Sequence, residues 1–531
     1  MHPHASESPI VTTHLGPMNY SSANEEGAFD LAVELFVNIF EQLDLQSLLR
    51  CCLVCKLFQG IIKESPTIQY KIELEIAGLV DRPSVKLSIK ERIISLKSYQ
   101  ETFKSLGLPT MWATRFDEGF YLTYCGDVAL VMRCKNVEMN EQPLGQFQYD
   151  GLKACHVEPP YVTSGAPRKW WSLRTTSPFT SVCVDPSQDV IILYNQDPFS
   201  GPLEGLPLIL QVLSISTGEI LAGGDICVPL PNSFLGWRVT AVQIWDDMIA
   251  TVMKRFDIQQ SEEVILFIGW KDGIVRAQLK ASIAHSNLRF LSRSRFLLDH
   301  RSFGNEFGIH LYTFNPDISS DSDNPPPPRL IAIFQLPSLS SPKTQLWISM
   351  VGLSDRGCHN YLDSRRVFET SRNKGVLGLN IFCTSEDGTT RENVLIVIDP
   401  FILRSFSPMA IQDDPEVISW ASWGPRNSRF IDSPEIRPSL GPVCYGTRVL
   451  LPDKLLDFNN LDVMRDINRF KRDGVNPHPF NTYHGRSSPT RYKAGLLFRE
   501  DVVSELPYRE VGHAFEGPLW DICPGEDWVH R

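Results

Sequence analysis

Leu31-Ala-Val-Glu-Leu-Phe-Val-Asn-Ile-Phe-Glu-Gln-Leu-Asp44 is the stretch that decides the fold of the N-terminal part of this 531-residue chain. Within it Leu31, Leu35, Ile39 and Leu43 recur at every fourth position. This spacing places the four side chains along one side of an α-helix. Asp30 is suited to cap the N-terminus of that helix. The stretch therefore predicts an amphipathic helix with a continuous apolar stripe.

Two more short helices are expected directly after the first. Asp44 can cap a second helix, and the pair Ser65–Pro66 ends a third. Their apolar positions are Leu45, Leu48 and Leu49 in the second helix, and Val54, Phe58, Ile61 and Ile62 in the third. So small a unit cannot bury all of these groups within itself and normally needs another surface. The pattern alone leaves two alternatives open, a helical cap packed on the rest of the chain or a bundle that docks on a partner.

Beyond residue 110 the apolar period changes from helical spacing to two, which predicts a mainly β region. The expected strands are Val182–Val184, Val190–Leu193, Leu208–Ile215, Val239–Ile244, Ile249–Met253, Val264–Trp270, Leu330–Leu336, Val394–Ile398 and Val443–Leu451. Many short strands with hardly a helix between them indicate a sandwich, a barrel or a propeller. The region is too long for one sandwich.

A weak internal repeat favours the propeller. Thr180-Ser-Val-Cys-Val, a turn and Val190-Ile-Ile-Leu match Thr240-Ala-Val-Gln-Ile, a turn and Ile249-Ala-Thr-Val. Each copy continues into a strand that ends in a glycine turn, at Gly218 and at Gly273. The copies lie 60 residues apart at Thr180 and Thr240 and 55 residues apart at Gly218 and Gly273. A repeat of this length has the size of a propeller blade with long loops, and the region has room for about seven blades. The expected fold is therefore a small all-α unit followed by a seven-bladed, WD-repeat-like β-propeller.

These patterns divide the chain into a disordered tail (1–28), a three-helix domain (29–65), a helical linker (66–108) and the β region (109–531). Loop insertions are expected near 316–329, which contains Pro325–Pro328, and near 459–491, with a short helix around Leu461–Phe470. The basic stretch from Arg465 to Lys493 is interpreted as a solvated loop in preference to a phosphate or RNA site.

Composition argues against several function classes. With 51 Lys and Arg against 62 Asp and Glu, the net charge is −11, so no nucleic-acid partner is expected. There is no signal peptide and no apolar run long enough to span a membrane, so no membrane association is expected either. We expect an intracellular protein, cytoplasmic or nuclear or both.

No recognisable catalytic or metal-binding motif appears in the sequence. Cys52-x-x-Cys55 lacks a second ligand pair at workable spacing, so core packing is the preferred interpretation. The histidines are dispersed, and neither a nucleophile elbow nor a phosphate-binding glycine loop is present. The pairs Trp170–Trp171 and Trp420/Trp423 are expected to pack within or between blades. The expectation is therefore no catalytic residue, no metal and no cofactor, with an enzymatic site hidden in the β region as a minor alternative.

The N-terminal helices resemble the F-box. The stretch quoted above, followed by Leu48-Leu-Arg-Cys-Cys-Leu-Val-Cys-Lys-Leu-Phe, is similar to the family pattern Leu-Pro-x-Glu-Leu, Ile-Phe, a leucine, a leucine pair and Val-Cys/Ser-Lys/Arg-x-Trp/Phe. One departure is Ala32, where the family has proline, a residue that favours the start of a helix. A looser likeness to fungal F-box proteins with a degenerate propeller rests on Ser65-Pro-Thr-Ile-Gln-Tyr-Lys-Ile-Glu-Leu-Glu-Ile-Ala-Gly-Leu, Ser419-Trp-Ala-Ser-Trp-Gly-Pro, Cys444-Tyr-Gly-Thr-Arg and Leu506-Pro-Tyr-Arg-Glu-Val.

The resemblance implies a non-catalytic subunit that docks on the Skp-type adaptor of a cullin–RING ubiquitin ligase and presents an unidentified protein substrate through its β region. A scaffold that binds the adaptor without directing degradation is the alternative. By family position the adaptor contacts would be Leu31, Glu34, Leu35, Ile39, Leu43, Leu48, Leu49, Val54, Cys55 and Phe58. The sequence identifies no substrate-binding residue.

Overall fold

The computed structural model divides the chain into two compact units, Met1–Gln69 and Tyr70–Arg531. The boundary between these two units lies inside the helix Pro66–Ala77. The expected tail, 1–28, and Asp30 lie outside the described residues. The structure describes residues 31–82, 85–104, 120–125, 128–134, 149–156, 170–175, 178–185, 188–195, 208–228, 237–255, 262–281, 287–301, 307–317, 325–340, 345–352, 367–371, 374–385, 391–407, 414–432, 443–451, 454–473, 484–486 and 488–512.

The first unit contains the three expected helices, α1 (Val33–Gln42), α2 (Leu45–Val54) and α3 (Lys56–Glu64). Asp44 caps α2 as predicted, because its carboxylate accepts a hydrogen bond of 2.8 Å from the Ser47 amide. That hydrogen bond holds the pKa of Asp44 below its usual value. The Cys55 thiol caps α3 in the same manner, accepting from the Phe58 amide at 3.5 Å.

The expected linker, 66–108, is mainly helical where it is described, and it starts at the end of the first unit and continues in the second. It consists of α4 (Pro66–Ala77), the short strand β1 (Leu79–Asp81) and α5 (Ile89–Lys104). β1 pairs antiparallel with β19 (Phe368–Thr370). One cluster of buried side chains joins α4, α5 and β19: Tyr70, Leu74, Leu96, Tyr99 and Phe368. The strand was not expected, because three residues are too few for a visible alternation.

The β region contains, among the described residues, six sheets of four or five strands, and all pairs but one are antiparallel. The first sheet is β2–β5 (Phe120–Cys125, Val128–Cys134, Tyr149–His156, Trp170–Leu173), and the second is β6–β9 (Ser181–Asp185, Val190–Asn195, Leu208–Ser214, Ile220–Val228). The third is β10–β13 (Trp237–Trp245, Met248–Arg255, Glu263–Gly269, Val275–Ala281), and the fourth is β14–β17 with β22 (Leu288–Ser292, Arg295–Arg301, Phe307–Thr313, Arg329–Gln335, Glu416–Ile418). The fifth is β18, β20, β21 and β23 (Gln345–Gly352, Leu377–Thr384, Arg391–Ile398, Ser428–Asp432), and the sixth is β24–β26 with β30 and β27 (Val443–Tyr445, Arg448–Leu450, Lys454–Asp457, Tyr508–Gly512, His484–Arg486). A further pair joins β28 (Thr490–Tyr492) to β29 (Val502–Ser504).

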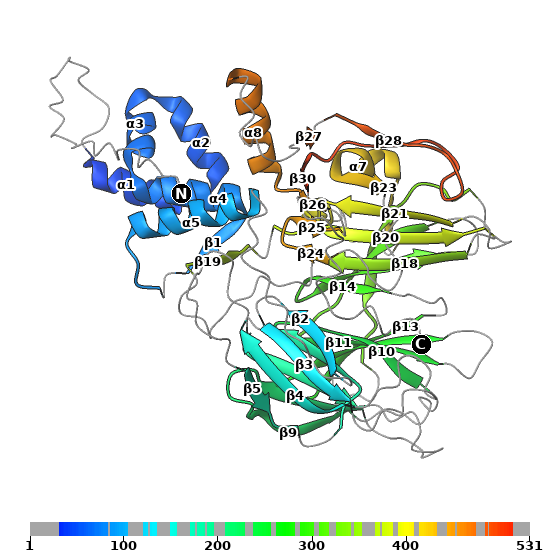
Figure 1. Ribbon diagram of the computed structural model, residues 1–531. Coiled ribbons are helices and arrows are strands. Elements are labelled where there is room, and N and C mark those ends of the chain that lie inside the picture. The colour runs from blue at the N-terminus through cyan, green and yellow to red at the C-terminus, as the bar shows by residue number, and fades with distance from the viewer. Residues whose placement is uncertain are drawn as a thin grey trace, which may run out of the picture. The chain divides into compact units, whose positions relative to one another are not determined.

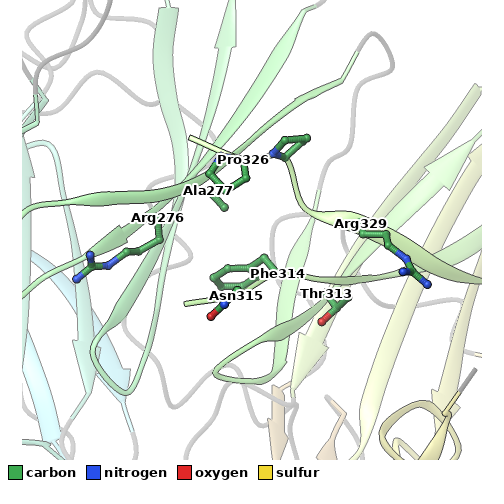
Figure 2. Close-up of a pocket in the computed structure, with 8 residues that line it drawn as sticks. Arg276, Ala277, Thr313, Phe314, Asn315, Pro326 and Arg329 are labelled. Carbon is green, nitrogen blue, oxygen red and sulfur yellow. The ribbon is translucent and has the colours of Figure 1, made fainter. Parts of the chain in front are cut away.

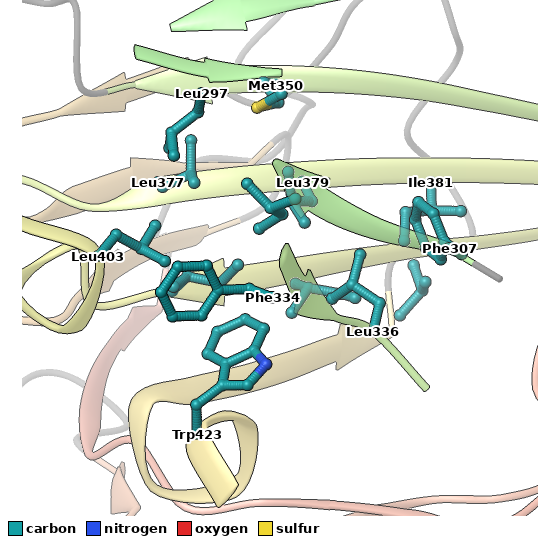
Figure 3. Close-up of a cluster of buried hydrophobic side chains, with 14 of the residues drawn as sticks. Leu297, Phe307, Phe334, Leu336, Met350, Leu377, Leu379, Ile381, Leu403 and Trp423 are labelled. Atoms are coloured by element: carbon teal, nitrogen blue, oxygen red, sulfur yellow. The ribbon is translucent and has the colours of Figure 1, made fainter. Parts of the chain in front are cut away.

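Successive sheets pack on one another through buried apolar clusters, and each cluster draws on two sheets that follow one another in the chain. Figure 3 shows the one between the fourth and fifth sheets, where Phe334 lies beside Trp423 and Leu379. The first strands of neighbouring sheets are also in contact, as β10 is with both β6 and β14. Figure 1 shows β18, β20 and β21 of the fifth sheet side by side. In the described part of the chain no such cluster joins the sixth sheet to the first, and no seventh sheet of this size occurs. The fold is therefore a mainly β unit of consecutive small sheets, and seven closed blades are not shown.

The predicted repeat corresponds to two equivalent sheets, β6–β9 and β10–β13. In each sheet the turn between the first two strands contains an aspartate with positive φ, Asp189 at 58° and Asp246 at 51°. The turn between the last two strands contains a glycine with positive φ, Gly218 at 71° and Gly273 at 72°. Glycine adopts this conformation at little cost, and aspartate tolerates it better than most residues. The two sheets thus use the same residue types in corresponding turns, which supports the predicted repeat, although Asp189 and Asp246 are not equivalent positions within it.

Eight of the nine expected strands are present, and the ninth run contains a turn. Val443–Leu451 splits into β24 and β25 around Gly446, whose φ is 56°. The helices α6 (Phe401–Ser405), α7 (Trp420–Asn427) and α8 (Asn460–Asp473) interrupt the strands. The helix expected near Leu461–Phe470 is thus confirmed as α8, and Pro325–Pro328 has no regular structure, as expected.

The start of the basic stretch, residues 465–473, is more than a solvated loop, because it belongs to α8, which contributes buried side chains to the β unit. Val463 has no exposed surface, and Ile467 is 8% exposed. A signal for this role was present, because Val463, Ile467 and Phe470 follow the i, i+4, i+7 spacing of one helix side.

Gly352, at the end of β18, is a position where the backbone excludes any side chain. Its φ is 82°, and an added Cβ would overlap the carbonyl oxygen of Val376. We expect Gly352→Ala to lower the free energy of unfolding of the β unit by about 1–3 kcal/mol in urea titrations. Gly60→Ala is the matched control, because no atom lies within 4 Å of an added Cβ there. Alanine in the middle of α3 should stabilise the helix by about 1 kcal/mol. Equal losses in both variants would contradict the prediction.

Candidate functional site: exposed apolar side chains of the N-terminal helices

Helix α1 has two apolar stripes, and one of them is buried. Phe36 and Phe40 are 5% and 2% exposed. The Phe58 ring from α3 completes an aromatic cluster, with its centroid 5.3 Å from that of Phe36 and 5.2 Å from that of Phe40. Such aromatic contacts add stability beyond the area that they bury. This inner stripe is the core of the three-helix unit.

The second stripe, which starts at Leu31 just before α1 and continues along the helix, is left open. Leu31, Leu35 and Ile39 are each about half exposed, at 48%, 47% and 49%. Helix α2 carries a comparable pair one turn apart, Leu49 at 52% and Leu53 at 85% exposed. Val33, Val54 and Leu57 are also exposed. We refer to these eight side chains together as the exposed apolar set: Leu31, Val33, Leu35, Ile39, Leu49, Leu53, Val54 and Leu57. So many exposed large apolar groups in one short segment are typical of an interaction surface.

The structure separates the ten adaptor contacts expected from family position into three groups. Six of them are exposed, namely Leu31, Glu34, Leu35, Ile39, Leu49 and Val54. Leu43, Cys55 and Phe58 are half-buried. Leu48 has no exposed surface, so it is a core residue in this structure and is not available to a partner. Leu48 and Leu49 are neighbours in sequence, and consecutive residues point about 100° apart around a helix, so one is buried and the other exposed.

Val33, Leu53 and Leu57 belong to the exposed set but were not expected. The family pattern quoted above assigns no apolar residue to these positions. A signal for Leu53 was nevertheless present, because it follows Leu49 by four residues and extends the same side of α2. No comparable signal marks Val33 or Leu57.

The cysteines of this unit have structural roles. Cys51, Cys52 and Cys55 are free and half-buried. Burial is the largest influence on the Cys52 thiol and raises its pKa, which disfavours the reactive thiolate. The described residues contain no group of three or more potential metal ligands. The interpretation of Cys52-x-x-Cys55 as packing is thus refined, since Cys55 also caps a helix.

The tryptophan pairs take part in packing within the β unit. The Trp171 indole donates a hydrogen bond of 2.7 Å to the carbonyl of Ile215, which links the first sheet to the second. Trp423 is 2% exposed and donates to the carbonyl of Gln335 at 2.9 Å. Trp420 meets Trp423 edge to face. Of these residues, neither Trp171 nor Trp423 is free to act as a ligand platform.

The family comparison identifies the class of this unit. Residues 33–68 match the family model described as F-box-like. The matched segment contains α1, α2 and α3, and with them seven of the eight members of the exposed apolar set. F-box domains typically bind a Skp-type adaptor, and proteins that carry them are generally non-catalytic adaptors or substrate receptors.

A comparison with curated proteins finds no match for the chain. Among solved structures it is similar to prolyl oligopeptidase B from Galerina marginata, at 10% identity and a TM-score of 0.26, covering 51% of this chain and 29% of that one. An uncharacterized protein from Listeria monocytogenes EGD-e matches at 12% identity and a TM-score of 0.29, covering 66% of this chain and 95% of that one. The Pyrococcus horikoshii acylaminoacyl peptidase matches at 10% identity and a TM-score of 0.28, covering 72% of this chain and 57% of that one. The chain thus spans less than two thirds of either peptidase, and likenesses this distant carry no functional argument.

Within the described part of the chain, no helix is both long and apolar enough to cross a membrane.

Proposed function

We propose that this protein is the substrate-recognition subunit of a Skp–cullin–F-box ubiquitin ligase, located in the cytoplasm, the nucleus or both. In this proposal helices α1–α3 dock on the Skp-type adaptor, and the β unit holds a target protein for ubiquitination. The observation that carries the proposal is the exposed apolar set, which falls almost entirely inside the F-box-like segment. The protein itself performs no chemistry. It raises the effective concentration of the target near the ubiquitin-loaded enzyme.

The energetics of the exposed set support docking. Full burial of one leucine, isoleucine or valine side chain contributes roughly 1.5–3 kcal/mol. The members are about half exposed or more, so a partner can still bury a large part of this surface. Only a few well-packed side chains usually dominate an interface. The eight available here are enough for a specific complex even after the entropic cost of association is met.

For the second unit we propose a propeller-like arrangement of its six small sheets, with one of its surfaces binding the substrate. Sequential four-stranded antiparallel sheets, packed on one another in chain order with their first strands in contact, support this arrangement. The target-binding residues belong to this unit in the proposal, because the exposed apolar set is committed to the adaptor.

Binding of the purified full chain to a recombinant Skp-type adaptor tests the docking part of the proposal. We expect a one-to-one complex by isothermal titration calorimetry, with a dissociation constant below about 1 μM and a negative heat-capacity change, since burial of apolar surface has that signature. No detectable binding at concentrations of tens of micromolar would refute the assignment of the helices as an adaptor-docking unit.

The scaffold alternative predicts the same adaptor complex and therefore needs a different measurement. Protein half-lives measured by mass spectrometry after depletion of this protein distinguish the two functions. A substrate receptor lengthens the half-lives of a small set of proteins when it is removed. An unchanged set of half-lives favours the scaffold.

A further inference from the structure

The β unit contains a cavity of about 410 Å³ between its third and fourth sheets. Arg276 and Ala277 of β13 form one wall, and Thr313, Phe314 and Asn315 at the end of β16 form another. Pro326 and Pro327, with Arg329 at the start of β17, close the third side (Figure 2). The walls come from β13, the last strand of the third sheet, and from β16 and β17 of the fourth, so the cavity lies away from the contacting first strands β10 and β14. Its volume is within the range of roughly 300–1,000 Å³ that is typical of ligand sites.

The interior of the cavity is apolar and rigid. Phe314 is held in place by the Phe267 ring, with 4.5 Å between the centroids. Ala277 leaves space because its side chain ends at Cβ. The proline wall is fixed by its own covalent geometry and lies beside β13, where the Gln278 amide donates to the Pro326 carbonyl at 3.4 Å. A preformed wall of this kind loses little conformational entropy when a ligand binds.

Two arginines lie at the rim of the cavity with their side chains directed away from Phe314 (Figure 2), and they differ in their partners. Arg276 forms an ion pair with Asp272 of the preceding turn, so its charge is already compensated. Arg329 is exposed, and within the described residues its guanidinium makes neither an ion pair nor a hydrogen bond. A guanidinium with five donors matches a carboxylate in geometry as well as in charge. The net charge of −11 does not prevent this pairing, because salt screens charges beyond about 8 Å.

We propose that this cavity binds a short peptide segment in which an acidic residue stands next to a leucine or an aromatic residue. The apolar side chain enters between Phe314, Ala277 and the proline wall, and the carboxylate pairs with Arg329. This inference deepens the proposed function, on which it rests, by naming the class of substrate segment. It places recognition between β13 of the third sheet and β16 and β17 of the fourth.

The test begins with panning of the purified full chain against a random heptapeptide phage library, and the most enriched peptide is then synthesised with a fluorescent label. We expect enriched sequences to pair Asp or Glu with Leu, Phe or Trp within two positions. In anisotropy titrations Arg329→Glu should weaken binding of that peptide at least tenfold. Arg329→Lys should lose less, and exchange of the acidic residue of the peptide for its amide should also weaken binding.

Arg426→Glu is the matched control, because Arg426 is an exposed arginine on α7, outside the cavity lining, and the substitution makes the same change of charge. It should change the affinity less than twofold. Three outcomes overturn the inference: no enrichment of acidic and apolar pairs, equal affinity for the wild-type chain and Arg329→Glu, or binding only when the peptide carries a phosphate. Affinity for the Skp-type adaptor is measured in parallel on the same variants. A chain that binds the peptide but not the adaptor counts against the proposed function. A chain that binds the adaptor but not the peptide counts against this inference alone.

Discussion

Replacing both Leu35 and Leu49 with aspartate is expected to weaken binding to a Skp-type adaptor by roughly 1,000-fold. Both side chains are about half exposed, one on α1 and the other on α2. At the centre of an interface each such substitution typically costs about 2 kcal/mol or more, and each 1.4 kcal/mol is a tenfold change in affinity. Calorimetric titration of the purified variant against the adaptor measures the change.

The exposed positions of Leu35 and Leu49 make this double variant interpretable. It should unfold at the same temperature as the wild-type chain, because no buried group is altered. Leu48→Asp should instead unfold the helical unit, since Leu48 has no exposed surface and a buried carboxylate has a large desolvation cost. Phe401→Asp is the matched control, an exposed apolar residue (68%) on α6 of the other unit. Unchanged adaptor affinity in the Leu35 and Leu49 variant would show that the exposed apolar set is not the docking surface.

Replacing Arg509 with leucine is expected to cost the β unit about 4 kcal/mol of unfolding free energy. The Arg509 side chain is 3% exposed and is surrounded by three carboxylates that are almost as deeply buried. It donates to Asp466 and to Asp462 at 2.8 Å each, and it also pairs with Asp457. Removal of one partner of a buried ion pair typically lowers the free energy of unfolding by about 3–5 kcal/mol, because the other charge is left uncompensated. The loss expected here lies in that range. Urea-induced unfolding followed by tryptophan fluorescence measures the loss.

The cluster around Arg509 fastens α8 to the last sheet. Asp462 and Asp466 lie one turn apart on α8, Asp457 ends β26, and Arg509 belongs to β30. Asp462 also pairs with Arg465, which pairs in turn with Glu73 of α4. The expected loss should therefore be accompanied by faster hydrogen exchange in α8. Arg499→Leu, a substitution at an exposed arginine of the same unit, serves as the control and should change stability by less than about 0.5 kcal/mol.

The effect of Arg509→Leu should depend on pH. Burial alone would raise the pKa of Asp457, but the charges of Arg509 and then Arg448 outweigh it and hold that pKa below its usual value. A carboxyl group with a depressed pKa in the folded state contributes stability above its unfolded pKa of about 3.9 and loses that contribution as the pH falls. In the variant the buried carboxylates no longer face the Arg509 charge. Protonation at lower pH removes their uncompensated negative charge and with it the loss of unfolding free energy. The difference in stability between wild type and variant should be largest near pH 7 and should narrow toward pH 4. A difference independent of pH would contradict the electrostatic explanation.

The helical unit could be anticipated in detail because its signals are local. The spacing of Leu31, Leu35 and Ile39, the Asp44 cap and the Ser65–Pro66 stop each act within a few residues of chain, and the structure confirms the helices they predict. The two repeat copies around Asp189 and Asp246 were visible for the same reason, since turn chemistry is a property of the local backbone. Strand position was predictable as well, but the number of sheets and their closure depend on packing between distant segments.

Local pattern alone indicated amphipathic helices rich in apolar residues between residues 31 and 64 and short antiparallel strands beyond residue 110. Only the three-dimensional packing decided which apolar side chains stay exposed. Leu48 and Leu49 are chemically the same residue, yet contacts within the fold cover one and leave the other open. Packing also turned the charged segment of α8 into part of the core, through an arginine more than 40 positions away in the chain. Burial is set by neighbours in space, and a one-dimensional pattern does not contain those neighbours.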